Sequence, residues 1–228
     1  MSINVFLPCR KGSQRVPKKN IKEFAGFKNG LIEIKLKQLL ECKKIDKIYL
    51  STNDEEILTY AQSLNQNRIV LHKRAEDLSS SETSTDELVS HVLELIPDDD
   101  ILWTHVTSPF LNANVYDDII KKYQEVKNKG FDSLMTTNLI HGFLWNKKEP
   151  INYDRTKEKW PRTQTIEPLH EINSAVFLAN AEIYRTLSDR IGTNPFLYEL
   201  DKIKGFDIDW EDDFKIAEAI LKSGVAKI

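Results

Sequence analysis

The N-terminal segment reads Leu7-Pro8-Cys9-Arg10-Lys11-Gly12-Ser13-Gln14-Arg15-Val16-Pro17-Lys18-Lys19-Asn20. Apolar side chains at Ile3, Val5 and Leu7 predict a buried first strand immediately before it. In open α/β sheets, ligands bind at the carboxyl ends of strands, and this segment begins at the carboxyl end of the predicted strand. Its five cationic side chains, with the backbone N–H groups that Gly12 and Ser13 leave accessible, predict a cradle for a polyanion such as a triphosphate.

The alternative interpretation of this charge is a solvated surface loop. Its position at a strand end, with Gly and Pro close by, favours the cradle. The sequence contains neither the P-loop pattern of glycines before Lys-Ser or Lys-Thr nor a G-x-G-x-x-G fingerprint. It therefore supports neither a P-loop NTPase nor a dinucleotide-binding dehydrogenase.

The composition is that of a globular protein, and we expect a single domain over residues 1–228. Hydrophobic residues make up 40% and charged residues 29%, with a net charge of −3. That near-neutral charge gives no global attraction to nucleic acid, so we expect no nucleic-acid partner. No run approaches the ~20 apolar residues that a membrane span needs, and no signal-like segment stands at the N-terminus, so we expect no membrane partner and a cytoplasmic location.

The cysteines and histidines give no sign of a metal or disulfide framework. Cys9 and Cys42 form no C-x-x-C pair, which fits a reducing compartment, and Cys9 is expected to be a small packing residue. The histidines lack the H-E-x-x-H spacing of a catalytic zinc site.

Apolar runs alternate with helical patterns over residues 3–137. Strands are predicted at 3–8, 46–51, 68–71, 101–104 and 132–137, and helices at about 31–42, 54–63, 84–95 and 114–127. Asp54 and Asp86 are expected to begin helices, and Gly130 to follow a helix end. After residue 170 we expect a strand at 175–178 and helices at 182–187 and 211–222. The alternation predicts an α/β fold with a mostly parallel sheet flanked by helices.

The pattern breaks at about 139–170, where aromatic and proline residues occur without a helical period. We expect an inserted arm there. Exposed aromatic side chains are costly unless something covers them, and a symmetric partner chain would cover Trp145 and Trp160. The alternative is that these two tryptophans cap the core of their own domain.

Two acids, Asp207 and Asp209, flank Ile208 near the C-terminus. On a strand, side chains at i and i+2 point to one face, so the two carboxylates are expected to converge. Beside a triphosphate such a pair suits Mg²⁺, which is commonly held by one or two carboxylates, phosphate oxygens and water. The alternative is a solvated strand end with helix-capping acids, because a further run of acids follows at 211–213.

These segments together resemble one family. Pro8-x-Arg10-x-Gly12-Ser13-x-Arg15-x-Pro17-x-Lys19-Asn20-Ile21, followed by Gly26, is similar to the N-terminal signature of the CMP-sialic acid synthetase (acylneuraminate cytidylyltransferase) family. Further blocks follow in the family's order: Leu50-Ser51-Thr52-Asn53-Asp54, Thr107-Ser108-Pro109 and Phe206-Asp207-Ile208-Asp209. The resemblance implies a Rossmann-like nucleotidyltransferase fold, and a homodimer with a contact around the arm. It also implies transfer of CMP from CTP to an acidic keto sugar with Mg²⁺ and release of pyrophosphate.

The cradle and the resemblance together give the candidate nucleotide-binding residues. They are Arg10, Gly12, Ser13, Arg15, Lys19, Asn20 and Arg74. The resemblance places Arg74 on the cytosine base, with an ordinary surface arginine as the alternative, and matches Asp207 and Asp209 to the metal ligands. The catalytic candidates are Arg10 and Lys19, which would neutralise charge on the departing pyrophosphate, and Asp209, through a metal-bound hydroxide. Lys19→Ala is accordingly expected to reduce turnover far more than stability.

The acceptor-binding pattern departs most from the family. The family's Gln-x-Thr-Ser-Pro-Leu-Arg reads His105-Val106-Thr107-Ser108-Pro109-Phe110-Leu111 here, and the Arg two residues before the family's Asn is Glu171. The candidate substrate-binding residues are His105, Thr107, Ser108 and Asn173, with a structural histidine as the alternative for His105. The changes point to a differently decorated acid, such as a legionaminic- or pseudaminic-type nonulosonate or an eight-carbon keto acid.

Two other functions stay open. One is a Kdo-type or other sugar nucleotidyltransferase. The other is a non-catalytic nucleotide-binding homologue, which His105, Leu111 and Glu171 would permit. The intact pair Asp207 and Asp209 favours an enzyme, because a sensor needs no reaction-competent metal geometry.

Overall fold

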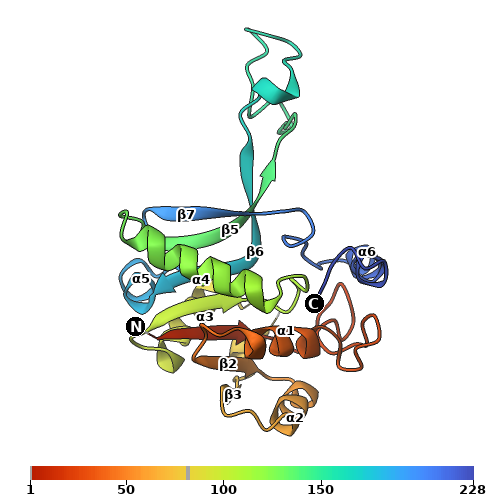
Figure 1. The fold of residues 1–228 in the computed structure, drawn as a ribbon, viewed down its shortest axis with the longest axis vertical. Coiled ribbons are helices and arrows are strands. Elements are labelled where there is room, and N and C mark those ends of the chain that lie inside the picture. The colour runs from red at the N-terminus through yellow and green to blue at the C-terminus, as the bar shows by residue number, and fades with distance from the viewer. Residues whose placement is uncertain (1, 81–82) are drawn as a thin grey trace.

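The structure is a computed structural model that describes residues 2–80 and 83–228. Within these residues, seven strands form one sheet in the order β3-β2-β1-β4-β6-β5-β7 (Figure 1). The strands are β1 Ile3–Pro8, β2 Lys47–Thr52, β3 Ile69–Lys73, β4 Asp100–Thr104, β5 Ser133–Ile140, β6 Leu169–Asn180 and β7 Pro195–Leu200. The helices are α1 Gly30–Glu41, α2 Glu55–Ser63, α3 Thr85–Leu95, α4 Ala113–Lys127, α5 Ala181–Leu187 and α6 Glu211–Lys222, with short 3-10 turns η1 Asp77–Ser79 and η2 Thr163–Thr165.

The sheet is mostly parallel, which confirms the predicted α/β class. The pairs β1–β2, β1–β4, β2–β3 and β5–β7 are parallel. Strand β6 is antiparallel to both β4 and β5. This reversal follows from the connection, because β5 and β6 are joined by an extended arm instead of the crossover helix that a parallel pair requires.

Both faces of the sheet are covered. On β1, Val5 and Leu7 pack in the larger core cluster with residues of α1 and α4, whereas Phe6 between them packs in a second cluster with α3 and α5. Successive strand residues point to opposite faces, so the uninterrupted apolar run of β1 is what a doubly covered strand needs. None of the helices of the described residues has the length and apolar character for crossing a bilayer.

Apart from the strand expected at Asp207 and Asp209, the predicted elements all occur, and the other differences lie at boundaries and at one missed strand. Asp54 caps α2 as expected, because its side chain accepts a hydrogen bond from the Glu56 N–H. Helix α3 is instead capped by Ser84, which forms a capping box with Glu87, so the prediction that Asp86 begins this helix is wrong. Strand β7 was not predicted.

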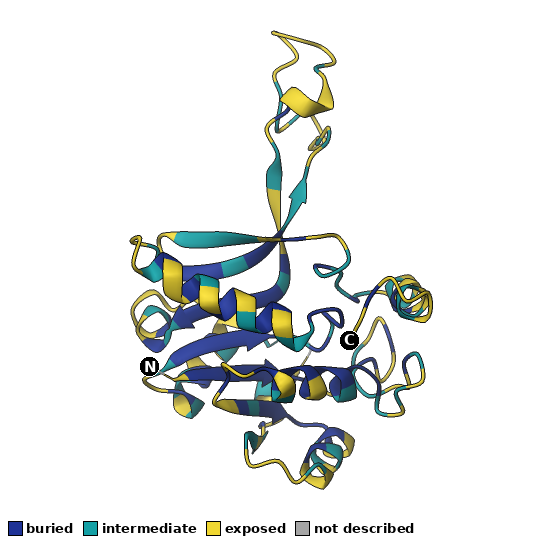
Figure 2. Cartoon of the chain, in the orientation of Figure 1, coloured by how far each residue is buried: buried dark blue, intermediate teal, exposed yellow. Residues whose placement is uncertain are grey.

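Residues 141–168 project as an arm from the ends of β5 and β6 (Figure 1). Figure 2 shows that most of this arm is exposed. Trp145 is 47% and Trp160 69% exposed, so the alternative in which they cap the core is wrong. The arm has its own aromatic cluster, in which Phe143 packs edge-to-face against Tyr153 and Trp160 at centroid distances of 5.2 and 5.5 Å.

Candidate functional site

The loop after β1 is held in a defined shape. The Lys11 N–H donates to Asn53 Oδ1 at 2.8 Å, which ties the loop to the end of β2. The Asn20 side chain donates to the Arg10 carbonyl at 3.0 Å, which folds the loop back on itself, and Val16 anchors it in the core. Gly12 has φ +79°, a conformation that glycine adopts without strain. The cationic segment is therefore a formed cradle.

Many of the predicted site residues line one cavity of about 580 Å³ at the carboxyl ends of β1 and β4. They are Arg10, Ser13, Arg15, Lys19, Asn20, His105, Thr107, Asp207 and Asp209. The N-terminal loop, the turn after β4 and the segment before α6 meet here, although they are far apart in sequence.

The two acids lie in the extended connection between β7 and α6, so the prediction that they stand on a strand is wrong. A different constraint places them. The N–H of the buried Ile208 donates to the Thr107 carbonyl at 2.9 Å, and its carbonyl accepts from Lys19 Nζ at 2.7 Å. Because Ile208 is fixed from both sides, Asp207 and Asp209 on either side of it both line the cavity.

The cradle and the acids are in direct contact. Arg15 Nη2 lies 3.1 Å from Asp209 Oδ1, and Lys19 Nζ lies 3.6 Å from the same oxygen. The guanidinium of Arg15 also lies 5.0 Å from the Trp210 ring. Arg15 and Asp209 are both nearly half exposed, so their ion pair contributes only about 0–1 kcal/mol. A bound phosphate would therefore displace it at little cost.

Asp207 carries an unsatisfied oxygen. Its Oδ1 is buried, and no group of the described residues donates a hydrogen bond to it. Burial raises the pKa of Asp207, a hydrogen bond from Thr107 opposes that shift, and the neighbouring charge of Asp209 adds to it. A buried carboxylate oxygen without a partner is costly unless a cation or donor joins it.

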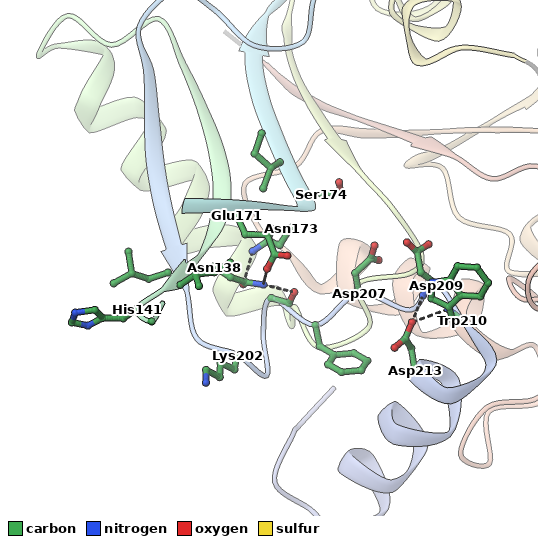
Figure 3. A pocket seen from close by; sticks show the side chains of 16 residues that line it. Asn138, His141, Glu171, Asn173, Ser174, Lys202, Asp207, Asp209, Trp210 and Asp213 are labelled. Carbon is green, nitrogen blue, oxygen red and sulfur yellow. Dashed lines mark hydrogen bonds between the residues drawn. The ribbon is translucent and has the colours of Figure 1, made fainter. Parts of the chain in front are cut away.

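The acids also border a second cavity, of about 830 Å³ (Figure 3). The two cavities share Ser174, Asp207 and Asp209, so these residues stand at their junction. Within the described part of the chain, no group of three or more His, Cys, Asp or Glu residues is placed to hold a metal ion. Asp207 and Asp209 by themselves therefore do not make up such a group.

Asn173 lies in the wall of this second cavity and not of the first. Its Oδ1 accepts from Thr136 Oγ1 at 2.7 Å, and its Nδ2 donates to Asn138 Oδ1 at 3.0 Å. Asn138 in turn donates to the Gly205 carbonyl at 3.4 Å, as the dashed lines of Figure 3 show. Asn173 thus belongs to a network that holds the connection carrying the two acids against the sheet.

His105 is a neutral donor in the first cavity. Its Nε2 accepts a hydrogen bond from Trp103 Nε1 at 3.0 Å, which leaves the proton of the neutral ring on Nδ1. Burial lowers the pKa of His105 to about 3, and the positive charge of Arg190 is the next largest cause. His105 is thus a hydrogen-bond donor and not a cation at neutral pH.

Three predicted residues lie outside both cavities. Ser108 is fully buried and its carbonyl accepts from Lys35 Nζ at 2.8 Å, so it shapes the turn after β4. Gly12 lines a separate small hollow of about 230 Å³. Arg74 is 3% exposed and donates from Nε to Ser79 Oγ at 3.1 Å, while its buried Nη1 has no acceptor among the described residues. The alternative of Arg74 as an ordinary surface arginine is wrong.

Cys9 is buried beneath the cradle, and burial raises the pKa of its thiol to about 12. The thiol is therefore neutral and unreactive at physiological pH, in agreement with the expected packing role.

Sequence reasoning missed several residues that line the first cavity. They are Thr85 and Leu88 of α3, Trp103 of β4, Ser174 of β6 and Arg190 in the segment before β7. Arg190 stands in no recognisable motif, so no signal in the sequence marks it. Ser174 directly follows the predicted Asn173 and has φ +57°, a conformation that the sequence does not reveal.

Comparison with known protein families gives one match over most of the chain. The family model described as Cytidylyltransferase matches residues 5–222. Pseudaminic acid cytidylyltransferase of Campylobacter jejuni is 23% identical over 224 residues, which are 95% of each chain. N-acylneuraminate cytidylyltransferase of Escherichia coli is 24% identical over 227 residues, which are 96% of this chain and 52% of that relative. The chain thus spans nearly the whole of the first relative and about half of the second.

Solved structures include a similar fold. CMP:2-keto-3-deoxy-manno-octonic acid synthetase complexed with CTP matches with a TM-score of 0.71, over 98% of this chain and 100% of that chain. The sequence identity is 14%, so this match shows a shared fold.

Proposed function

Because the chain belongs to the cytidylyltransferase family, we propose that it transfers CMP from CTP to an acidic keto sugar and releases pyrophosphate. The observation that carries this proposal is the meeting of the cationic loop with Asp207 and Asp209 in one cavity. The names of the relatives, one for pseudaminic acid and one for N-acylneuraminate, support a nonulosonate as the acceptor.

The cradle would bind the phosphates of CTP. Arg10 and Arg15 offer guanidinium forks and Lys19 a single ammonium group, while Ser13 adds a hydroxyl donor on the same cavity wall. These groups would align the nucleotide and share the charge of the leaving pyrophosphate. Loss of one well-placed donor to developing charge costs about 3–4 kcal/mol in oxyanion holes, and we expect a comparable loss here.

The acceptor would enter from the second cavity, since that cavity joins the first at the two acids. A hydroxyl of the sugar attacks the α-phosphorus, the new phosphorus–oxygen bond forms, and the bond to the pyrophosphate oxygen breaks. The protein's work is alignment, because the reacting oxygen must lie in line with the departing one. The network of Asn138, Asn173 and Gly205 supports that alignment by fixing the connection that carries the acids.

The two acids fit a Mg²⁺ ion. Asp207 Oδ1 is a buried acceptor without a donor, and Asp209 lies beside it on the shared wall. Asp207 and Asp209 would hold the ion, and phosphate oxygens and water would complete its six ligands. When bound, Mg²⁺ supplies positive charge against the charge that develops on the phosphates. Arg15 and Lys19 now contact Asp209, and they would turn to the nucleotide in its presence.

Pyrophosphate release tests the proposed function. The protein is incubated with CTP, Mg²⁺ and, in turn, N-acetylneuraminate, pseudaminate and 2-keto-3-deoxy-manno-octonate, and released pyrophosphate and CMP-sugar are measured. We expect one of these acids to give both products in equal amounts. CTP binding without either product from any sugar would support the non-catalytic alternative. ATP, GTP and UTP serve as matched controls for the nucleotide.

We also propose that the protein is a homodimer that uses the arm. Trp145 and Trp160 are exposed there, together with the aromatic ring of Phe143. Large apolar side chains that gather on one projection are typical of an interaction surface, and a second copy is the symmetric partner that would cover them.

A cytoplasmic location completes the proposal. Both cysteines are free and buried, which fits a reducing compartment.

A further inference from the structure

Arg190 is a cation of the first cavity that the mechanism above does not use. Its guanidinium carbon lies 3.7 Å from the centroid of the Phe177 ring and 5.0 Å from that of Trp103. Trp103 and Phe177 are direct partners in the register of β4 and β6, so their rings form one aromatic floor. Stacking on this floor fixes the plane of the guanidinium group in the cavity wall.

Arg190 forms no ion pair with any of the described residues. Within the described part of the chain, no carboxylate lies within 4.0 Å of its guanidinium group, whereas Arg15 and Lys19 both contact Asp209. Burial lowers the pKa of Arg190, and Tyr184 and Asp189 oppose this only through longer-range attraction. A partly buried cation without a counter-charge is costly, and an anionic ligand would remove that cost.

The two cavities differ in charge. Of the described residues that line the second cavity, Lys202 alone is cationic, whereas four are acids: Glu171, Asp207, Asp209 and Asp213. A carboxylate ligand would be repelled there. The first cavity contains Arg10, Arg15, Lys19 and Arg190 against Asp207 and Asp209. An acidic acceptor would therefore direct its carboxylate toward the first cavity and leave its neutral part in the second.

Resting on the proposed function, we propose that Arg190 binds the carboxylate of the acceptor sugar, with His105 donating a hydrogen bond beside it. The guanidinium fork suits bidentate contact with a carboxylate, and His105 carries its proton on Nδ1. In the ring form of a 2-keto acid, the carboxylate and the attacking hydroxyl are attached to the same carbon. Binding of the carboxylate by Arg190 therefore positions the attacking hydroxyl. Arg190 is thus a residue that determines specificity for acidic acceptor sugars.

The test compares an acid with its methyl ester. The sugar that the wild type turns over fastest, among N-acetylneuraminate, pseudaminate and 2-keto-3-deoxy-manno-octonate, is assayed in both forms. A charge-assisted hydrogen bond makes the wild type prefer the acid about 10- to 100-fold in kcat/KM. Arg190→Met keeps an apolar side chain over the aromatic floor, and we expect its preference to fall to about threefold or less. The KM for CTP should not change. Arg190→Lys keeps the charge without the fork and should be intermediate.

Two further variants serve as controls. Arg185→Met removes an exposed arginine of α5 that pairs with Glu182 and Asp98, and it should keep the wild-type preference for the acid. Lys202→Met tests the alternative that Lys202, the cation of the second cavity, binds the carboxylate of the sugar. Melting temperatures are measured for all variants, and if Arg190→Met does not fold, Arg190→Lys and Arg190→Gln take its place.

Three results would overturn the assignment of Arg190. The first is a wild type that uses acid and ester equally, and the second is a rise in the KM for CTP in Arg190→Met. The third is the wrong variant response: a preference for the acid that survives in Arg190→Met or disappears in Lys202→Met. Failure of the proposed function looks different, because then the wild type itself neither binds nor turns over any of the three sugars, and the assignment falls with it.

Discussion

Lys19 Nζ donates a hydrogen bond to the carbonyl oxygen of Ile208 at 2.7 Å, which joins the N-terminal loop to the connection before α6. Lys19 is only 9% exposed, and burial lowers its pKa while Asp209 and Asp207 oppose that shift. Lys19 is therefore part of the structure that places the acids, as well as a charge available to phosphate. The expectation that its loss would reduce turnover far more than stability stays a prediction, and the contact with Ile208 adds a loss of stability to it.

We predict that Lys19→Met weakens both folding and turnover. Loss of a buried, charge-assisted hydrogen bond costs about 1.5–3 kcal/mol in the free energy of unfolding, and the freed Ile208 carbonyl adds a desolvation cost. Turnover should fall at least ~100-fold. Urea unfolding and pyrophosphate release are the measurements. Lys18→Met is the matched control, because Lys18 makes an exposed pair with Glu56 and should change stability by at most ~0.5 kcal/mol. A Lys19→Met protein as stable as the wild type would contradict the role of the Ile208 contact.

Asp209→Asn should remove turnover without unfolding the protein. Its ion pairs with Arg15 and Lys19 are partly exposed, so their loss changes stability by about 1 kcal/mol or less. Turnover should fall at least ~100-fold, because the proposed metal loses a ligand. The role in metal binding is measured separately. The melting temperature is determined with CTP alone and with CTP and Mg²⁺ together, and the difference is the increment due to Mg²⁺. We expect this increment to shrink in Asp209→Asn and to persist in Asp212→Asn, whose side chain is 90% exposed. An undiminished increment in Asp209→Asn would exclude the acid as a ligand.

The fold could be predicted where local pattern and tertiary packing agree. Strand β1 is apolar throughout and covered on both faces, so its sequence alone marks it as a buried strand. Strand β7 was missed although it contains an apolar run, because it begins at a proline and lies at the sheet edge, where its side chains are mostly half-buried. Ser84 was missed as a cap because Asp86 in the first turn gives the same local signal.

The site could be predicted in part, because its charged segments stand in recognisable motifs. Asp207 and Asp209 come together as expected, but not because they stand on a strand. Ile208 between them is held by contacts with Lys19 and Thr107, which are distant in sequence. Arg190 enters the cavity only because β4 and β6 bring Trp103 and Phe177 together beneath it. That arrangement is a property of the sheet and has no local signature.

His105 should make the protein less stable in acid. Its pKa in the folded state is about 3, below the ordinary value of 6.5, mainly because of burial. Between these pH values the imidazole binds a proton in the unfolded chain but not in the folded chain. The stability that neutral His105 gives the folded state is therefore complete above pH ~6.5 and is lost as the pH falls toward 3. We predict that the free energy of unfolding falls by up to about 1.4 kcal/mol per pH unit more steeply in the wild type than in His105→Gln. Urea unfolding of both proteins between pH 7 and 4 measures this difference. Parallel profiles would show that His105 titrates normally.

Gly205 packs closely against the side chains of Asn138 and Asn173. A Cβ atom there would lie 1.9 Å from Asn138 Oδ1 and 2.9 Å from Asn173 Nδ2. We predict that Gly205→Ala lowers the free energy of unfolding by about 1–3 kcal/mol and reduces turnover, because the acids shift with the backbone. Gly142→Ala is the matched control, because a Cβ at Gly142 would meet nothing within 4 Å. Adding Asn138→Ala to Gly205→Ala should cost less than the sum of the single changes, since it makes room for the methyl group. Additive losses would show that the clash is not the cause.

The arm gives the last prediction, which concerns assembly. Trp160 is 69% exposed and its ring contacts Phe143 of the same arm, so a second copy is the proposed cover. We predict that the wild type sediments as a dimer at micromolar concentration. Trp160→Ser should weaken dimerisation by about 2 kcal/mol or more, as loss of a tryptophan anchor does in other interfaces. Val225→Ser is the control, because Val225 is equally exposed, at 69%, but lies outside the arm. Sedimentation velocity over a concentration series gives the dissociation constants. A monomeric wild type, or a Trp160→Ser dimer as tight as the wild type, would rule out the arm as the dimer contact.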